Sequence, residues 1–174
     1  MLFDNILNSF AVVIENNFFT NVSRFIGFVF DPIPLLWISL VISLIVFFKC
    51  SKKKAMFFAS SMICSAGFIY VVKKIIQRTR PLNMLIAETG FSFPSGHSMI
   101  AIVFFFGLVY LLVPQKHKKL GTIIALFVSL FIGFSRIYLR VHWFSDVMFG
   151  FLFGAIVIIL EDFLYKRIKS KETI

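Results

Sequence analysis

The sequence predicts an all-α fold: a polytopic transmembrane helical bundle of about five spanning helices plus N-terminal interfacial amphipathic helices. Two observations support this prediction. Of the 174 residues, 59% are hydrophobic, 25 of them Phe, and the mean hydropathy is +0.93, which is more apolar surface than a soluble domain of this length can bury. The apolar residues also gather into five long segments that short basic segments separate.

The first 31 residues are predicted to form one or two amphipathic helices in the membrane interface. Apolar residues recur there at helical spacing, while Glu15 and Arg24 interrupt any possible span. The apolar set is Ile6, Leu7, Phe10, Val13 and Ile14. A solvated linker is the alternative, and the Phe residues between positions 18 and 30 argue against it.

Residues 32–165 are predicted to form one transmembrane domain, followed by a basic cytoplasmic tail over 166–174. The five expected spans are 32–48, 55–72, 97–113, 120–137 and 144–165. A span needs about 20 apolar residues, or a few fewer with basic flanks. It must be helical, because each backbone amide in lipid needs a partner within its own segment.

The charges predict the orientation of these spans. Eleven of the 18 Lys and Arg residues fall in segments that five alternating crossings put on one side of the membrane. They are Lys49, Lys52, Lys53, Lys54, Lys116, Lys118, Lys119, Lys166, Arg167, Lys169 and Lys171. Basic loops mark the cytoplasmic side. We therefore expect a multi-pass protein of the plasma (inner) membrane, whose 73–96 and 136–143 connections face away from the cytoplasm.

The remaining seven cations lie on that extracytoplasmic side, where topology does not require them, and so predict an anion site. They are Arg24, Lys73, Lys74, Arg78, Arg80, Arg136 and Arg140. Lys73 and Arg80 are seven residues apart and would point to one side of a continuing helix, until Pro81 turns the chain away. An amine and a guanidinium together suit a phosphoryl group. The alternative is that both snorkel to lipid headgroups.

A second polar stretch, Pro-Ser-Gly-His over 94–97, opens the apolar segment 97–113. The free amides of a helix start, with a Ser95 hydroxyl and a small Gly96, form an anion site. His97 at its edge can hold a proton for a leaving group near neutral pH. The alternative is that Ser95 only caps the helix and His97 is a bystander.

A third stretch, SRIYLRVHWFSD over 135–146, carries Arg136, His142 and Asp146. An Asp four residues after a His can accept a hydrogen bond from one ring nitrogen, which leaves the other nitrogen as a nucleophile or base. A structural His–Asp pair between two helices is the alternative. Arg140 and Trp143 are expected to be interface anchors.

Together, Lys-x6-Arg-Pro, Pro-Ser-Gly-His and Ser-Arg-x5-His-x3-Asp resemble the pattern of the type 2 phosphatidic acid phosphatases, a membrane lipid phosphatase family related to vanadium haloperoxidases. The likeness covers about residues 33–165 and shows no substitution within the motifs. The stretches 78–98 and 135–148 look closest to bacterial enzymes that act on phosphatidylglycerol phosphate or undecaprenyl diphosphate. Members of this type often have six spans, and amphipathic helices replace the first span here.

The resemblance implies that His142 attacks phosphorus and becomes a phosphohistidine, that Asp146 orients it, and that His97 protonates the leaving oxygen and later activates water. The residues implied to hold the phosphoryl oxygens are Lys73, Arg80, Ser95, Gly96 through its amide, and Arg136. No metal or cofactor is implied, because these cations and the helix start supply the stabilisation that Mg²⁺ supplies elsewhere. The expected partners are a membrane lipid phosphate and the bilayer.

Other functions fit the sequence less well. A non-catalytic lipid-phosphate binding or transport protein would need the cations but not the His142–Asp146 pair. An oxidase using vanadate in the same cradle is disfavoured by the compact, membrane-embedded chain. Nucleic acid is not an expected partner, since the basic residues are split between both membrane faces. Glu88 is either a solvated loop acid or a residue that tunes His97 or contacts substrate.

Overall fold

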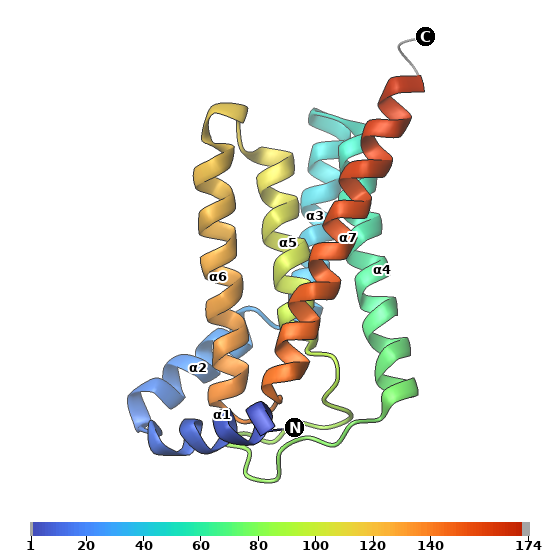
Figure 1. Ribbon diagram of the computed structural model, residues 1–174. Coiled ribbons are helices and arrows are strands. Elements are labelled where there is room, and N and C mark those ends of the chain that lie inside the picture. The colour runs from blue at the N-terminus through green and yellow to red at the C-terminus, as the bar shows by residue number, and fades with distance from the viewer. Residues whose placement is uncertain (1, 172–174) are drawn as a thin grey trace.

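In a computed structural model, which describes residues 2–171, the chain folds into a bundle of helices with two further helices across one end (Figure 1). The bundle consists of α3 (Pro32–Lys49), α4 (Lys52–Ile76), α5 (Gly96–Leu112), α6 (Lys118–Tyr138) and α7 (Phe144–Lys171), and a short 3-10 helix, η1 (Gln115–His117), precedes α6. The helices α1 (Leu2–Val13) and α2 (Asn17–Val29) lie across the lower end. The described residues contain no strand, which confirms the predicted fold class.

Four of the bundle helices, α3, α4, α6 and α7, are long and apolar enough to cross a membrane. The fifth expected span, α5, has 17 residues, which is at the lower end of the length that can span a bilayer. Its place explains why it can be short. α5 packs against α3, α4, α6 and α7 in the centre of the bundle, and residues 96–104 are all buried.

Two glycines of α7 bring this helix close to α5. A Cβ on Gly150 would lie 2.7 Å from the carbonyl oxygen of Ser95, and one on Gly154 would lie 3.0 Å from the carbonyl oxygen of Met99. Small residues four apart allow such close approach of helices in membranes. The Ser95 amide also donates a hydrogen bond to the Asp146 carbonyl at 3.0 Å. The starts of α5 and α7 are therefore fixed next to each other.

The end of α4 differs from the prediction that one helix carries both Lys73 and Arg80. The helix ends at Ile76, and Gln77 caps it in the left-handed region with φ of 48°. Arg80 lies four residues beyond the helix, in the irregular segment 77–95. The prediction placed the stop at Pro81, but the αL cap acts earlier, as is common at helix C-termini.

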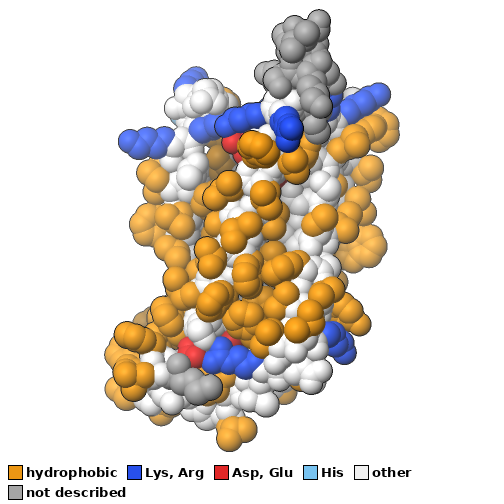
Figure 2. All heavy atoms as spheres, turned by 45° about the vertical axis from the view of Figure 1, so that its right-hand side comes forward, with side chains coloured by type: hydrophobic (Ala, Val, Ile, Leu, Met, Phe, Trp, Pro, Cys, Tyr) orange, Lys and Arg blue, Asp and Glu red, His pale blue; other side chains and the backbone are white. Residues whose placement is uncertain are grey.

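The basic segments gather at one end of the bundle. The α3–α4 turn, the α5–α6 connection and the end of α7 all lie at the upper end, whereas the segments 77–95 and 139–143 lie at the lower end with α1 and α2 (Figure 1). Figure 2 shows Lys and Arg side chains at the upper end above a broad band of hydrophobic side chains. Charge and hydrophobicity thus divide the surface as in a membrane protein.

Arg140 is not the interface anchor that the sequence suggested. It is buried, with its Nε donating to the Asn83 carbonyl at 2.6 Å and one terminal nitrogen 2.9 Å from the Glu15 carboxylate. Near this pair, the Tyr138 hydroxyl accepts a hydrogen bond from the Asn16 amide at 3.0 Å. These contacts attach the α1–α2 connection to the end of α6.

Candidate active site

A cavity of about 320 Å³ opens at the lower end of the bundle, where the three polar stretches of the sequence meet. Its polar lining consists of Lys73 at the end of α4, Arg80 and Glu88 from segment 77–95, Gly96 and His97 at the start of α5, His142 from the α6–α7 connection, and Asp31. Five of the eight predicted site residues therefore line one cavity. The other three, Ser95, Arg136 and Asp146, do not line it and contact or adjoin residues that do.

His142 is buried between a cation and a carboxylate. Its Nε2 lies 3.5 Å from a terminal nitrogen of Arg80, and its Nδ1 lies 3.6 Å from Oδ2 of Asp146. Because guanidinium can only donate, Nε2 carries the lone pair and Nδ1 carries the proton that faces Asp146. The distance to Asp146 is longer than a hydrogen bond, a feature common in active sites without substrate. Burial lowers the pKa of His142 to about 4, which keeps the ring neutral at neutral pH.

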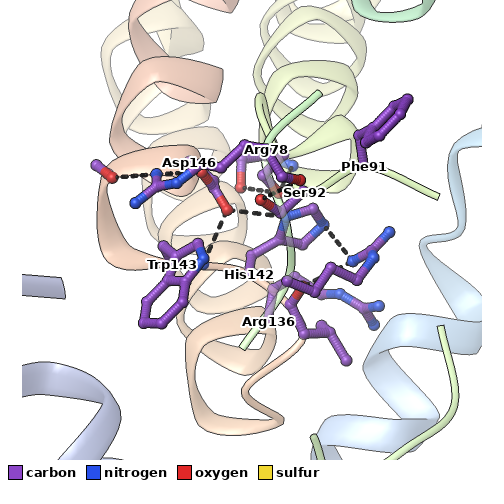
Figure 3. A network of polar contacts seen from close by, with 12 residues as sticks. Arg78, Phe91, Ser92, Arg136, His142, Trp143 and Asp146 are labelled. Carbon is purple, nitrogen blue, oxygen red and sulfur yellow. Dashed lines mark hydrogen bonds and ion pairs between the residues drawn. The ribbon is translucent and has the colours of Figure 1, made fainter. Parts of the chain in front are cut away.

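Asp146 is fully buried and is held by its neighbours rather than by His142 alone (Figure 3). Its Oδ2 accepts a hydrogen bond from the Trp143 amide at 2.9 Å, and its Oδ1 accepts one from Arg78 at 2.6 Å. The first of these is the backward contact of a capping box at the start of α7. The carboxylate is thus oriented toward His142 by one backbone donor and one cation.

Main-chain carbonyls hold Arg80 in place. Its Nε donates to the Gly90 carbonyl at 3.1 Å, and its terminal nitrogens donate to the carbonyls of Thr89 and Val141 at 3.1 and 2.6 Å. The side chain of Lys73 donates to the Phe91 carbonyl in the same segment. Segment 77–95 therefore orients both cations toward the cavity that they line.

Glu88 lies between the two guanidinium groups and is not a solvated loop acid. One carboxylate oxygen forms an ion pair with Arg136, and the other lies 3.8 Å from Arg80. Arg136 is almost fully buried, and its only ion pair in the described part of the chain is with Glu88. The Glu88 carboxylate thus contacts both guanidinium groups in the way that the oxygens of a phosphoryl group could.

Helix α2 contacts two of the predicted site residues, His97 and Arg136, which sequence reasoning did not anticipate. The Gly27 carbonyl lies 3.1 Å from Nε2 of His97, so that Nε2 carries a proton. A Cβ on Gly27 would come within 2.3 Å of a terminal nitrogen of Arg136. Only a glycine lets α2 pack this closely against the guanidinium.

The start of α5 supports one alternative for Ser95. Its buried hydroxyl accepts hydrogen bonds from the Ser98 amide and hydroxyl, at 3.4 and 2.9 Å, as an N-cap does. Gly96, the next residue, lines the cavity and exposes the first turn of α5 to it. The free backbone amides of the first turn of α5, which can bind an anion, therefore adjoin the cavity at Gly96.

An apolar cavity of about 340 Å³ lies between α3 and α4 and adjoins the polar one. It shares Ile33, Leu36 and Ala66 with the polar cavity and continues along Trp37, Leu40 and Ile63. A molecule that filled both cavities would have a charged head and an apolar tail.

Two further residues of the site were missed by sequence reasoning. Arg78 contacts Asp146 and also lies 2.6 Å from the Asp4 carboxylate of α1. The sequence signal was weak, because Arg78 is one of four cations between 73 and 80, and Asp4 is 74 residues away. An acid in the first turn of an amphipathic helix was the available clue.

Known proteins resemble this chain in sequence. A model of the PAP2 superfamily matches residues 54–167. Phosphatidylglycerophosphatase B of Bacillus subtilis is 41% identical over an alignment of 105 residues, and the match covers 57% of this chain and 52% of that protein. Undecaprenyl-diphosphatase of Sulfolobus acidocaldarius is 33% identical over an alignment of 143 residues, and the match covers 77% of this chain and 64% of that protein. The chain therefore spans less than two thirds of the length of either relative.

A solved structure is also similar. It is the crystal structure of a transmembrane PAP2 type phosphatidylglycerolphosphate phosphatase from Bacillus subtilis, with a TM-score of 0.86 and 32% identity. The match covers 95% of this chain and 85% of that one.

Proposed function

Because this chain belongs to the PAP2 superfamily, we propose that it is a membrane lipid phosphatase that releases inorganic phosphate through a phosphohistidine on His142. The observation that carries the proposal is the meeting of His97, His142, Lys73 and Arg80 around one cavity. Two cations suit a phosphoryl group. A neutral imidazole at His142 suits nucleophilic attack, and an imidazolium at His97 suits proton donation to the leaving oxygen.

In the first step, Nε2 of His142 attacks phosphorus, and the bond between phosphorus and the leaving oxygen breaks. The leaving oxygen takes a proton from the imidazolium form of His97, which becomes a neutral imidazole, and the Gly27 carbonyl, 3.1 Å from Nε2, orients the ring. The Nδ1 proton of His142 then faces Asp146, whose negative charge stabilises the imidazolium. In the second step, water gives a proton to His97 and attacks the phosphohistidine, which frees phosphate and restores His142.

The phosphoryl oxygens would be held by Lys73, Arg80, Arg136 and the Gly96 amide. Arg136 becomes available when the phosphate replaces the Glu88 carboxylate. Ser95 acts through the helix start, because its hydroxyl is the N-cap of α5. These donors surround the oxygens on which charge redistributes in the transition state, and we propose that they do so without a metal.

The substrate would be a lipid whose tail lies in the apolar cavity between α3 and α4. The shared lining by Ile33, Leu36 and Ala66 supports this, since it places the two cavities next to each other. Undecaprenyl diphosphate and phosphatidylglycerol phosphate are the leading substrates, in agreement with the names of the two relatives. Phosphatidic acid and the 1-phosphate of lipid A follow them.

The cavity would face away from the cytoplasm. The basic segments at the opposite end of the bundle support this orientation. Cys50, at the basic end, and Leu82, fully exposed at the other end, allow a direct test in a Cys64→Ala background. In intact cells, a membrane-impermeant maleimide is expected to label Leu82→Cys and not Cys50. Labelling of Cys50 alone would reverse the orientation.

The activity is tested with the purified protein and a panel of lipid phosphates, with inorganic phosphate release as the readout. The wild-type protein is expected to hydrolyse at least one, and His142→Ala none, because no other group replaces the nucleophile. Asp162→Asn, at the opposite end of the bundle, is the control. Binding without release by the wild-type protein would indicate a lipid-phosphate binding or transport protein.

A further inference from the structure

Asp4 of helix α1 is a buried carboxylate with every oxygen engaged. Oδ1 accepts a hydrogen bond from the Ser145 amide at 2.8 Å. Oδ2 accepts one from the Ser145 hydroxyl at 2.8 Å and one from Arg78 at 2.6 Å. Burial alone would raise the pKa of Asp4, but the hydrogen bonds from Ser145 and Arg78 outweigh burial and lower the pKa below its usual range. Asp4 is therefore ionised at neutral pH.

The partners of Asp4 connect it to the nucleophile. Arg78 bridges two carboxylates, with one terminal nitrogen on Asp4 and the other on Oδ1 of Asp146, each at 2.6 Å. The opposite oxygen of Asp146 faces Nδ1 of His142. Ser145, the other partner of Asp4, directly precedes Asp146 in the first turn of α7. Both routes from Asp4 thus end at the carboxylate that orients the nucleophile.

We propose that Asp4 is a positioning residue of the phosphatase: it holds Arg78 and the first turn of α7 so that Asp146 directs its Oδ2 at His142. The inference rests on the proposed function of His142. With Asp4 in place, Arg78 is shared between two carboxylates and keeps one fixed orientation. Without the charge of Asp4, both terminal nitrogens of Arg78 can bind Asp146. The Asp146 carboxylate is then neutralised by Arg78 and stabilises the His142 imidazolium less.

The location of Asp4 links this function to the membrane. The face of α1 that carries Asp4 is buried, whereas its exposed residues Leu2, Phe3, Ile6 and Phe10 are large and hydrophobic. An amphipathic helix of this kind binds the interface through such a face. The helix whose exposed face would bind lipid therefore also carries Asp4, whose carboxylate holds the partners of Asp146.

Three variants test the role of Asp4 in the full chain. Asp4→Asn keeps the shape, removes the charge and turns an amide NH₂ toward the donors of Arg78 or Ser145. Asp4→Glu keeps the charge with a longer reach. Asp162→Asn is the matched control, since Asp162 is also ion-paired, with Lys166 at 2.5 Å, but lies at the far end of α7.

The readouts are kcat and KM for the best lipid phosphate, and the competitive inhibition constant of inorganic phosphate. Asp4→Asn is expected to lower kcat about 10–100-fold, as loss of an orienting partner typically does. KM and the phosphate constant are expected to stay within about threefold, because Asp4 does not line the cavity that binds phosphate. Asp4→Glu is expected to recover part of kcat, and Asp162→Asn to match the wild type.

A second measurement separates positioning from general stability. In an Arg78→Gln background, Asp4→Asn is expected to cause little further loss of kcat, because both residues act on Asp146 together. Equal loss in both backgrounds would overturn the inference, as would a wild-type kcat in Asp4→Asn. A parallel loss of phosphate binding and kcat would show that Asp4 only supports the fold. If the wild-type protein releases no phosphate from any lipid, the proposed function itself fails.

Discussion

Substitution of Gly150 by Ala tests whether the close contact of α7 with α5 sets the geometry of the site. The new Cβ would lie 2.7 Å from the Ser95 carbonyl oxygen and 2.9 Å from the Ser98 Cβ. Real Cβ atoms do not approach other atoms closer than 3.0 Å, and most stay beyond 3.4 Å. The two helix starts must therefore separate by about 0.3–0.7 Å, because the nearest atom belongs to the backbone.

This separation acts at the contact that joins the two halves of the site. The Ser95 amide and the Asp146 carbonyl lie next to Gly150. His97 is the second residue of α5, and His142 lies two residues before the start of α7. Overpacking of a tight core costs about 1–3 kcal/mol, which corresponds to a lower unfolding temperature by about 2–12 °C for a chain of this size. Displacement of catalytic groups by a fraction of an ångström is expected to lower kcat about 10–100-fold.

The assay compares Gly150→Ala with Gly67→Ala in the same detergent. Gly67 lies on α4, and a Cβ added to it would have no other atom within 4 Å, so Ala there is expected to leave kcat unchanged and to stabilise the helix slightly. Unfolding is followed by thermal denaturation, and kcat by phosphate release. Wild-type values of both in Gly150→Ala would refute the reasoning, since the helices would then have room to spare.

Three further outcomes are expected. The acid limb of kcat/KM, corrected for substrate ionisation, lies near pH 4 rather than 6.5, because burial lowers the pKa of His142 to about 4. The free energy of unfolding also falls as the pH drops from about 6.5 toward 4, because His142 binds its proton at a higher pH in the unfolded chain than in the folded one. A limb at 6.5 would show an unperturbed His142. Glu88→Gln strengthens inhibition by inorganic phosphate several-fold, since a carboxylate no longer competes for Arg80 and Arg136; weaker inhibition would mean that Glu88 only supports these cations. Full activity survives EDTA, because protein cations hold the phosphoryl group; loss that Mg²⁺ restores would contradict this.

The sequence predicted the helices well and their ends less well. The spans followed from apolar segments of membrane length, and Pro32 correctly marked the start of α3. The stop of α4 was placed too late, because Gln77 adopts an αL conformation that no local residue type demands. The span predicted at 97–113 matches α5 to within one residue, but its central place among α3, α4, α6 and α7 is a property of the packing that the sequence does not show.

For the site, the sequence predicted which motif residues lie together, but not which residues hold them in position. His97, His142, Lys73 and Arg80 line one cavity, as the three stretches suggested. Arg140 was taken for an interface anchor, because its partner Glu15 lies 125 residues away. The roles of Asp4, Arg78 and Gly27 likewise depend on contacts between distant segments, which periodicity and spacing do not encode.

The way Arg80 is held has a consequence for how such proteins diversify. Its three closest acceptors are carbonyl groups of Thr89, Gly90 and Val141, so the chemistry of the neighbouring side chains is not needed to fix the guanidinium. Gly90, with φ of 72°, is the exception. If the cavity binds a lipid phosphate as proposed, the side chains around Arg80 can be exchanged, and with them the lipid head that is accepted, while the main chain keeps the guanidinium in place.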